Sequence, residues 1–195
     1  MSYMLAYPSN NGITTPNIQA DMVRYLNYGG KYSEYQKQEE RMAFKTLLVA
    51  YDGSEFGREA LRTAITNAPL WDAKIHVIYV VNPRYYASTI VDPQIGVVEP
   101  RSEHWIGMLE REAEEMLAEA EQIATDAGIE ITPHMVIGDP RDEIIDTAKE
   151  IEADLIILGS AGKGRAKRFL LGSVSTSVVT QSPIATLVVH THPEE

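Results

Sequence analysis

A glycine-rich segment directly after the apolar run 155–158 carries the clearest chemical signal in the chain. Glycine lets the backbone take positive φ and brings N–H groups close to an anion, and a helix that follows directs its positive dipole end toward that anion. The sequence therefore predicts a strand, a phosphate-binding loop and a helix that begins near Ser173. The residues of this predicted site are Gly159, Gly162, Lys163, Gly164, Arg165, Gly172, Ser173, Val174 and Ser175.

The spacing of this loop differs from two common phosphate motifs. A Walker A loop has Ser or Thr after its lysine, but Gly164 follows Lys163 here. A dinucleotide motif that started at Gly162 would need glycine where Lys167 stands. A simpler interpretation is that the glycines only turn the chain between strand and helix. The basic residues of the loop favour a phosphate ligand, because the chain as a whole has a net charge of −11.

Asp52 is the second candidate for ligand binding, because it directly follows a predicted strand over residues 47–51. A carboxylate at the carboxyl end of a parallel strand suits a ribose, whose two hydroxyls can both donate to it. The alternative is a turn-forming aspartate that precedes Gly53 and accepts only from local backbone N–H groups.

Composition limits the classes of function. The chain has 195 residues, 44% of them hydrophobic, which is enough for one sizeable core. A net charge of −11 opposes binding to nucleic acid or to an anionic membrane, and no apolar run reaches the length of about eighteen residues that a membrane helix needs. The absence of cysteine excludes disulfides and thiolate catalysis. We expect a cytoplasmic protein.

Strand and helix patterns alternate from Phe44 onward, which predicts a doubly wound parallel sheet of five strands with helices on both faces. The predicted strands span 47–51, 75–81, 131–137, 155–158 and 184–190. The predicted helices span 54–67, 102–127, 140–151 and 173–181, and a loop rich in Pro, Tyr and Val spans 82–101. We expect residues 44–195 to form this domain.

Residues 1–43 form a predicted N-terminal extension that carries six of the ten tyrosines. Short amphipathic helices are predicted over 17–28 and 32–41, and a poorly ordered arm is the alternative. Tyrosine is a large amphipathic anchor, so the extension could pack on its own subunit, on a second subunit or on another protein.

Three segments together resemble the universal stress protein family, in particular its ATP-binding members. They are the spacing Gly159-x2-Gly162-x9-Gly172-Ser173, the segment 46–55 and the segment 136–140. Ala50 stands where many such members have proline, and Lys163 where histidine or arginine is frequent. The resemblance implies strand order 3-2-1-4-5, which would place Asp52 and the glycine loop at one crevice where the strand order reverses.

The resemblance also implies the ligand and its contacts. The ligand would be ATP, or AMP or ADP, with Mg²⁺ carried by the phosphates. Adenine would be recognised by backbone groups at Val80, and Ala50 and Val174 would line the pocket. Residues 185–190 would pair with the same strand of a second subunit, because an apolar edge strand needs a covering partner.

The expected function is a regulatory or stress-response module that hydrolyses ATP slowly or not at all. No catalytic or metal-binding residues are predicted, and only His190 and His192 are expected to share a strand face. The alternatives are an ATP-hydrolysing or adenylate-forming enzyme, and a nucleotide-independent protein that contacts a partner through residues 1–43. Valine at Gly159 or Gly162 is expected to abolish nucleotide binding in a folded protein.

Overall fold

The computed structural model describes residues 3–6, 44–83, 90–92, 96–98, 103–162 and 171–190. The helices expected over 17–28 and 32–41 lie outside these ranges. So do three residues of the predicted site, Lys163, Gly164 and Arg165.

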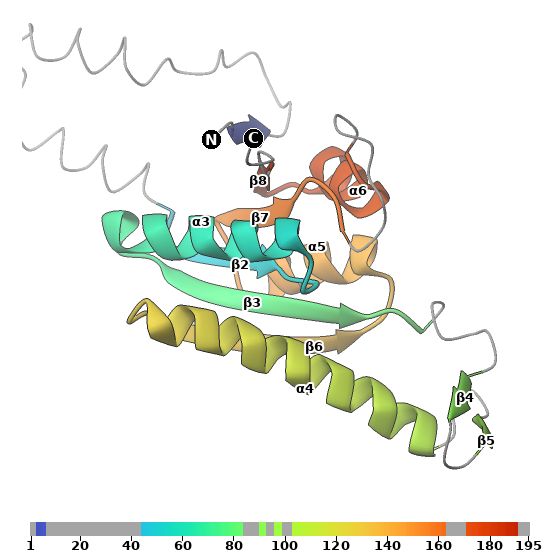
Figure 1. Ribbon diagram of the computed structural model, residues 1–195. Helices are drawn as coiled ribbons and strands as arrows, with labels where there is room; N and C mark the ends of the chain where they lie inside the picture. The colour runs from blue at the N-terminus through green and yellow to red at the C-terminus, as the bar shows by residue number, and fades with distance from the viewer. Residues whose placement is uncertain are drawn as a thin grey trace, which may run out of the picture.

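The centre of the molecule is a parallel sheet of five strands, as predicted (Figure 1). Its spatial order is β6-β3-β2-β7-β8, which in chain order reads 3-2-1-4-5 and confirms the expected topology. The order in which the chain adds strands reverses between β2 and β7, which are paired in parallel with Val49 opposite Ile157. The strands are β2 (Thr46–Ala50), β3 (Lys74–Val81), β6 (Ile131–Ile137), β7 (Leu155–Gly159) and β8 (Ala185–Val189).

Four helices cover the two faces of the sheet (Figure 1). They are α3 (Glu55–Trp71), α4 (Glu103–Asp126), α5 (Pro140–Glu150) and α6 (Ser173–Gln181). Helix α3 starts where predicted, because Ser54 accepts a hydrogen bond from the Gly57 N–H at 3.0 Å. It continues past the expected end at residue 67, with Pro69 inside it, and its last residue, Trp71, packs edge-on against Phe44.

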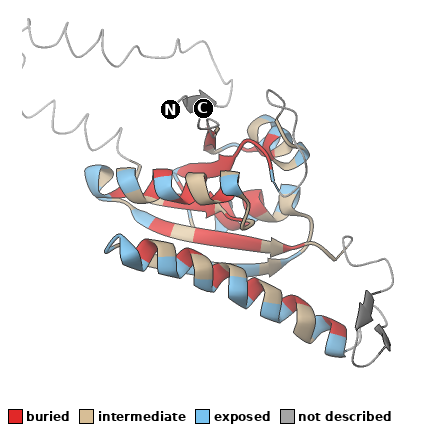
Figure 2. Cartoon of the chain, viewed as in Figure 1, coloured by how far each residue is buried: buried red, intermediate tan, exposed pale blue. Residues whose placement is uncertain are grey.

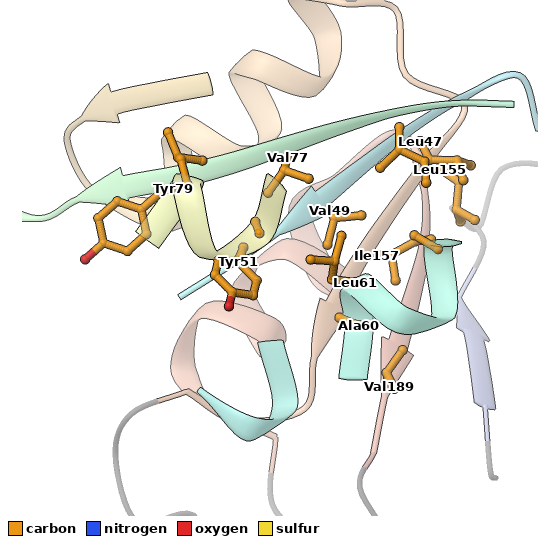
Figure 3. Packing of buried hydrophobic residues seen from close by; sticks show 14 of the residues in the cluster. Leu47, Val49, Tyr51, Ala60, Leu61, Val77, Tyr79, Leu155, Ile157 and Val189 are labelled. Atoms are coloured by element: carbon orange, nitrogen blue, oxygen red, sulfur yellow. The ribbon is translucent and has the colours of Figure 1, made fainter. Parts of the chain in front are cut away.

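Alternation along the strands sends side chains into two cores. Leu47 and Val49 of β2 pack with α3 and α4 (Figure 3), whereas Leu48 packs with α5 and α6. Every residue of β7 and β8 is buried (Figure 2), which explains why these strands read as continuous apolar runs rather than as alternating ones.

One edge of the sheet differs from expectation. The strand β1 (Tyr3–Ala6) pairs antiparallel with β8, so β8 is not the last strand of the sheet (Figure 1). Tyr3 lies opposite Val189, and Ala6 lies opposite Thr186. The edge that was expected to pair with a second subunit is therefore covered by the N-terminal extension of the same chain.

The segment 82–101 also contains more than the predicted loop. The short strands β4 (Ile90–Asp92) and β5 (Gly96–Val98) pair antiparallel as a separate two-stranded sheet. Valine and isoleucine favour extended backbone, but the prolines and polar residues around them made the segment resemble a loop.

Candidate functional site

Asp52 and the glycine loop lie against each other at the carboxyl end of the sheet. A Cβ atom added to Gly162 would lie 2.7 Å from the Asp52 Oδ2 atom. Gly162 belongs to the segment after β7, and Asp52 follows β2, so the two predicted motifs meet where the strand order reverses. The missing side chain at Gly162 leaves one carboxylate oxygen accessible from the loop.

The other Asp52 oxygen is held by the protein itself. Asp52 Oδ1 accepts a hydrogen bond from the Ser54 N–H at 3.0 Å, and a Cβ atom at Gly57 would lie 2.6 Å from the same oxygen. Gly53, which lies between Asp52 and Ser54, has φ +71°, a conformation that glycine adopts without strain. Oδ1 therefore holds the local turn, whereas Oδ2 faces the loop, so the turn and a ligand role, which the sequence offered as alternatives, would use different oxygens.

Gly159 is required for a different reason from the one predicted. Its φ is not positive; among the described glycines, only Gly53 and Gly128 have positive φ. A Cβ atom at Gly159 would instead lie 2.6 Å from the Phe56 Cβ and 2.8 Å from the Phe56 carbonyl carbon. The start of α3 thus packs directly on the end of β7. Valine at Gly159 is therefore expected to destabilise the folded protein as well, because the helix backbone occupies that space.

The first turn of α6 begins after the glycine loop. Gly172 is the residue before the helix, no side chain caps this end, and the Gly172 N–H donates to the Ser160 carbonyl at 2.7 Å. The first N–H groups of a helix lack partners within the helix and carry its positive dipole end. Ser173 is exposed at this turn. The turn therefore offers the backbone donors that an anionic group requires.

Ser175 has a structural bond that sequence reasoning missed. Its buried Oγ donates to the Gly159 carbonyl at 2.8 Å, which ties α6 to the end of β7. A serine hydroxyl has one proton to donate, so the Ser175 proton is used within the protein and is not available to a phosphate. The two serines that were predicted together therefore differ: Ser175 is bonded within the protein, and Ser173 is exposed.

Three residues of the predicted site share one apolar cluster. Ala50 at the end of β2, Val80 near the end of β3 and Val174 in α6 are all half-buried and pack on the core between the sheet and the helices α5 and α6. They are separated by up to 124 positions in the sequence (174 − 50) but lie on one face of the sheet. This face can provide an apolar surface beside Asp52.

Arg58 and Glu119, two charged residues near the end of β2, bind each other within the protein. Arg58 of α3 donates to Glu119 of α4 at 2.5 Å, and this bond lowers the pKa of the Glu119 carboxyl. Burial, and then the nearby Glu119 carboxylate, raise the pKa of the neighbouring Tyr51 phenol. Tyr51 is therefore neutral at physiological pH and is unsuited to act as a base.

Metal-binding clusters are absent from the described ranges, where no group of three or more His, Cys, Asp or Glu side chains could hold a metal ion. None of the described helices is long and apolar enough to cross a membrane.

A pair of histidines that was not predicted from the sequence lies away from Asp52 and Gly162. His76 of β3 and His134 of β6 lie on adjacent strands, with Nδ1 of His76 2.8 Å from Nε2 of His134. The expectation that only His190 and His192 could share a strand face is wrong. The predicted strand order already made β3 and β6 neighbours, but only the register brings the two rings together.

This pair predicts a pH dependence of stability. Burial, then His134, then Lys74, lower the pKa of His76 below its ordinary value of 6.5. The folded protein therefore binds fewer protons than the unfolded chain, and the free energy of unfolding falls as the pH drops below about 6.5. We expect urea unfolding at about pH 7.5 and about pH 5.5 to show a larger loss for the wild type than for His76→Asn. Equal losses in both proteins would contradict this assignment.

Comparison with known proteins gives one family. The model of the universal stress protein family matches residues 43–190. The curated protein Universal stress protein MJ0531 of Methanocaldococcus jannaschii is 34% identical over 147 residues, which cover 75% of this chain and 82% of that protein.

Two solved structures are similar over the same region. The structure of the protein MJ0577 has a TM-score of 0.64 and 27% identity, and the match covers 78% of this chain and all of that one. A universal stress protein in complex with cAMP has a TM-score of 0.56 and 27% identity, covering 77% of this chain and 99% of that one.

Proposed function

Because the chain belongs to the universal stress protein family, we propose that it is a module that binds an adenine nucleotide, and that this nucleotide is ATP. The observation that carries the proposal is the contact between Asp52 and the glycine loop, where a Cβ atom at Gly162 would meet Asp52 Oδ2 at 2.7 Å. A carboxylate oxygen, unpaired backbone donors and an apolar face then surround one crevice, as a nucleoside phosphate requires. The similar structure in complex with cAMP supports the same ligand class.

Each part of the nucleotide has a matching part of the site. Asp52 Oδ2 would accept from the ribose hydroxyls, while Oδ1 stays bonded to the Ser54 N–H at 3.0 Å. Backbone groups at Val80 would recognise adenine, and Ala50 and Val174 would line its pocket. The phosphates would lie between the first turn of α6 and the loop, bonded to its backbone and basic residues and carrying Mg²⁺. The loop and helix residues proposed for the phosphates are Gly159, Gly162, Lys163, Gly164, Arg165, Gly172 and Ser173.

We propose a regulatory role in which bound ATP is turned over slowly or not at all. Efficient phosphoryl transfer needs a positioned base and a metal-binding carboxylate in addition to phosphate donors. In the described part of the crevice Asp52 is the carboxylate in reach of the loop, and the ribose would occupy it. An ATP-hydrolysing or adenylate-forming enzyme is the alternative, and it predicts steady phosphate release with Mg²⁺.

The ribose contact can be tested with Asp52→Asn. Asparagine keeps an oxygen to accept from the Ser54 N–H, but its amide group replaces the acceptor that faces Gly162. Calorimetry should show ATP affinity about ten- to a hundredfold lower than in the wild type, and the wild type should lose part of the same energy with 2′-deoxy-ATP. Asp72→Asn is the matched control, because that exposed carboxylate lies at the far end of α3 and should leave affinity unchanged. Equal wild-type affinity for both sugars would count against the ribose role.

We propose that residues 44–195 form the nucleotide-binding domain, and that the extension 1–43 controls homodimer formation through residues 185–190. β1 and a second subunit cannot both occupy the same edge of β8, since each backbone donor and acceptor there pairs once. A nucleotide-independent interaction through the extension is the remaining alternative. It predicts that ATP does not alter thermal stability.

Removal of residues 1–6 should therefore increase dimer formation. The deletion frees the edge of β8. Its five residues are all buried, and all but Thr186 are apolar. Light scattering at matched micromolar concentrations should give a larger dimer fraction for the shortened chain than for the full chain, and removal of residues 191–195 should have no such effect. An unchanged monomer after the first deletion would show that β8 does not mediate self-association.

A further inference from the structure

The two histidines on β3 and β6 form a compact pair of nitrogen atoms on rigid strands. Nδ1 of His76 lies 2.8 Å from Nε2 of His134, and the ring centroids are 5.1 Å apart with 29° between the ring planes. Both side chains are half-buried, so each ring reaches solvent on one side. His134 lies opposite Ile78, two residues beyond His76, so the register of two paired strands sets the spacing.

This spacing matches two neighbouring ligands of one metal ion. Imidazole nitrogen binds zinc at about 2.0–2.1 Å. Two such nitrogens on one ion therefore lie about 3 Å apart when the N–Zn–N angle is between a right angle and the tetrahedral angle. The nitrogens of His76 and His134 are already close to that separation. Small ring rotations would turn both lone pairs toward a common point on the exposed side.

We propose that His76 and His134 form a bidentate site for a borderline divalent transition metal such as Zn²⁺, with water completing the coordination. The preference for this class follows from the ligands, because imidazole suits zinc, copper and nickel, whereas Mg²⁺ prefers oxygen. The chain contains no cysteine that would compete for such an ion. Within the described residues no third protein ligand joins the pair, which makes the site open rather than structural.

The proton balance of binding is simple. In the metal-free pair one ring nitrogen donates its proton to the other across 2.8 Å. When the metal takes both lone pairs, that proton moves to the second nitrogen of its own ring, so two neutral rings release no net proton. A protonated ring must first lose its proton, so affinity falls at acid pH. The positive charge of Lys74, which is exposed at the start of β3, weakly opposes binding.

The metal site is separate from the nucleotide crevice. His76 is the third residue of β3, whereas Asp52 and Gly162 lie beyond the carboxyl ends of β2 and β7. His76 is paired with Leu48 in the middle of β2, four residues before Asp52, so the histidine pair lies away from the carboxyl ends of the strands. Metal binding by the histidine pair therefore does not depend on a bound nucleotide.

Calorimetric titration of Zn²⁺ into the full chain without added nucleotide tests the site. At about pH 7.5 we expect saturable binding, with affinity reduced about tenfold or more in His76→Asn and in His134→Asn because each removes the chelate. His190→Asn is the matched control and should bind as the wild type does, since His190 follows β8 at the opposite side of the sheet. Mg²⁺ in place of Zn²⁺ should give no such binding.

A second readout separates lost ligands from a damaged fold. Zn²⁺ should raise the unfolding temperature of the wild type and of His190→Asn, because the pair exists only in the folded state, and should not raise it in the two pair variants. Gln replacements at the same positions serve if an Asn variant fails to fold. The proposal is overturned if wild-type protein shows no saturable Zn²⁺ binding up to about 1 mM, or if both pair variants bind Zn²⁺ with wild-type affinity.

Discussion

Gly159→Val should reduce the free energy of unfolding by about 3 kcal/mol, the upper part of the range for overfilled packing. The reason is steric: a Cβ atom at this position would lie 2.8 Å from the carbonyl carbon and 2.9 Å from the carbonyl oxygen of Phe56, and a helix backbone cannot move aside as a flexible side chain can. The same shift would strain the bond between the Gly159 carbonyl and Ser175 Oγ. Urea unfolding followed by circular dichroism would measure the loss.

Gly172→Ser is the control for this experiment. Its Cβ atom would make only ordinary contacts, the nearest at 3.5 Å, and serine is a favoured residue before a helix at its φ of −63° and ψ of 162°. The control should be as stable as the wild type or slightly more stable. A Gly159→Val protein with wild-type stability would mean that α3 does not pack on β7 as described.

Gly162→Val should abolish nucleotide binding while the protein stays folded. Gly162 is exposed, and its nearest neighbour is the end of the Asp52 side chain, at 2.7 Å from a Cβ atom. That carboxylate can swing away, so the fold tolerates valine, but Oδ2 then leaves the position proposed for ribose and the side chain covers the loop backbone. Calorimetry with ATP should detect no saturable binding, which for a micromolar ligand means a loss of about a hundredfold or more.

Gly107→Ala provides the matched control for binding, because nothing lies within 4 Å of a Cβ atom there and alanine favours helix. It should bind ATP as the wild type does. Comparison of the two loop glycines then separates their roles, since Gly159→Val should lower stability and Gly162→Val should lower affinity. Unchanged ATP affinity in Gly162→Val would remove the loop from the site.

Much of the fold could be predicted because its signals are local. The buried strands are continuous apolar runs, Ser54 and Asp139 mark helix starts, and alternation of strands with helices leads to a parallel sheet. The exceptions depend on distant contacts. Helix α3 extends to Trp71, where the ring of Phe44 packs 5.3 Å away, and β1 pairs with a strand whose paired residues lie at least 180 positions later in the chain. No local pattern carries that information.

The residue types of the candidate site could be predicted, but several of its packing contacts and hydrogen bonds could not. Asp52 and Gly162 could be assigned to one crevice once strand order was inferred, but the packing of Phe56 on Gly159 and the bond from Ser175 to the Gly159 carbonyl depend on how helices sit on the sheet. The histidine pair could not be predicted for the same reason. His76 and His134 are 58 positions apart, and only the register of β3 against β6 brings them together.

Mass spectrometry of small molecules released from the purified full chain tests the central claim most directly. The account predicts an adenine nucleotide, or saturable binding of ATP when the released fraction is empty, for the wild type and for Gly107→Ala. It predicts neither result for Gly162→Val, whose Cβ atom would displace Asp52 Oδ2. A wild-type protein that releases no adenine nucleotide and does not bind added ATP would contradict the account.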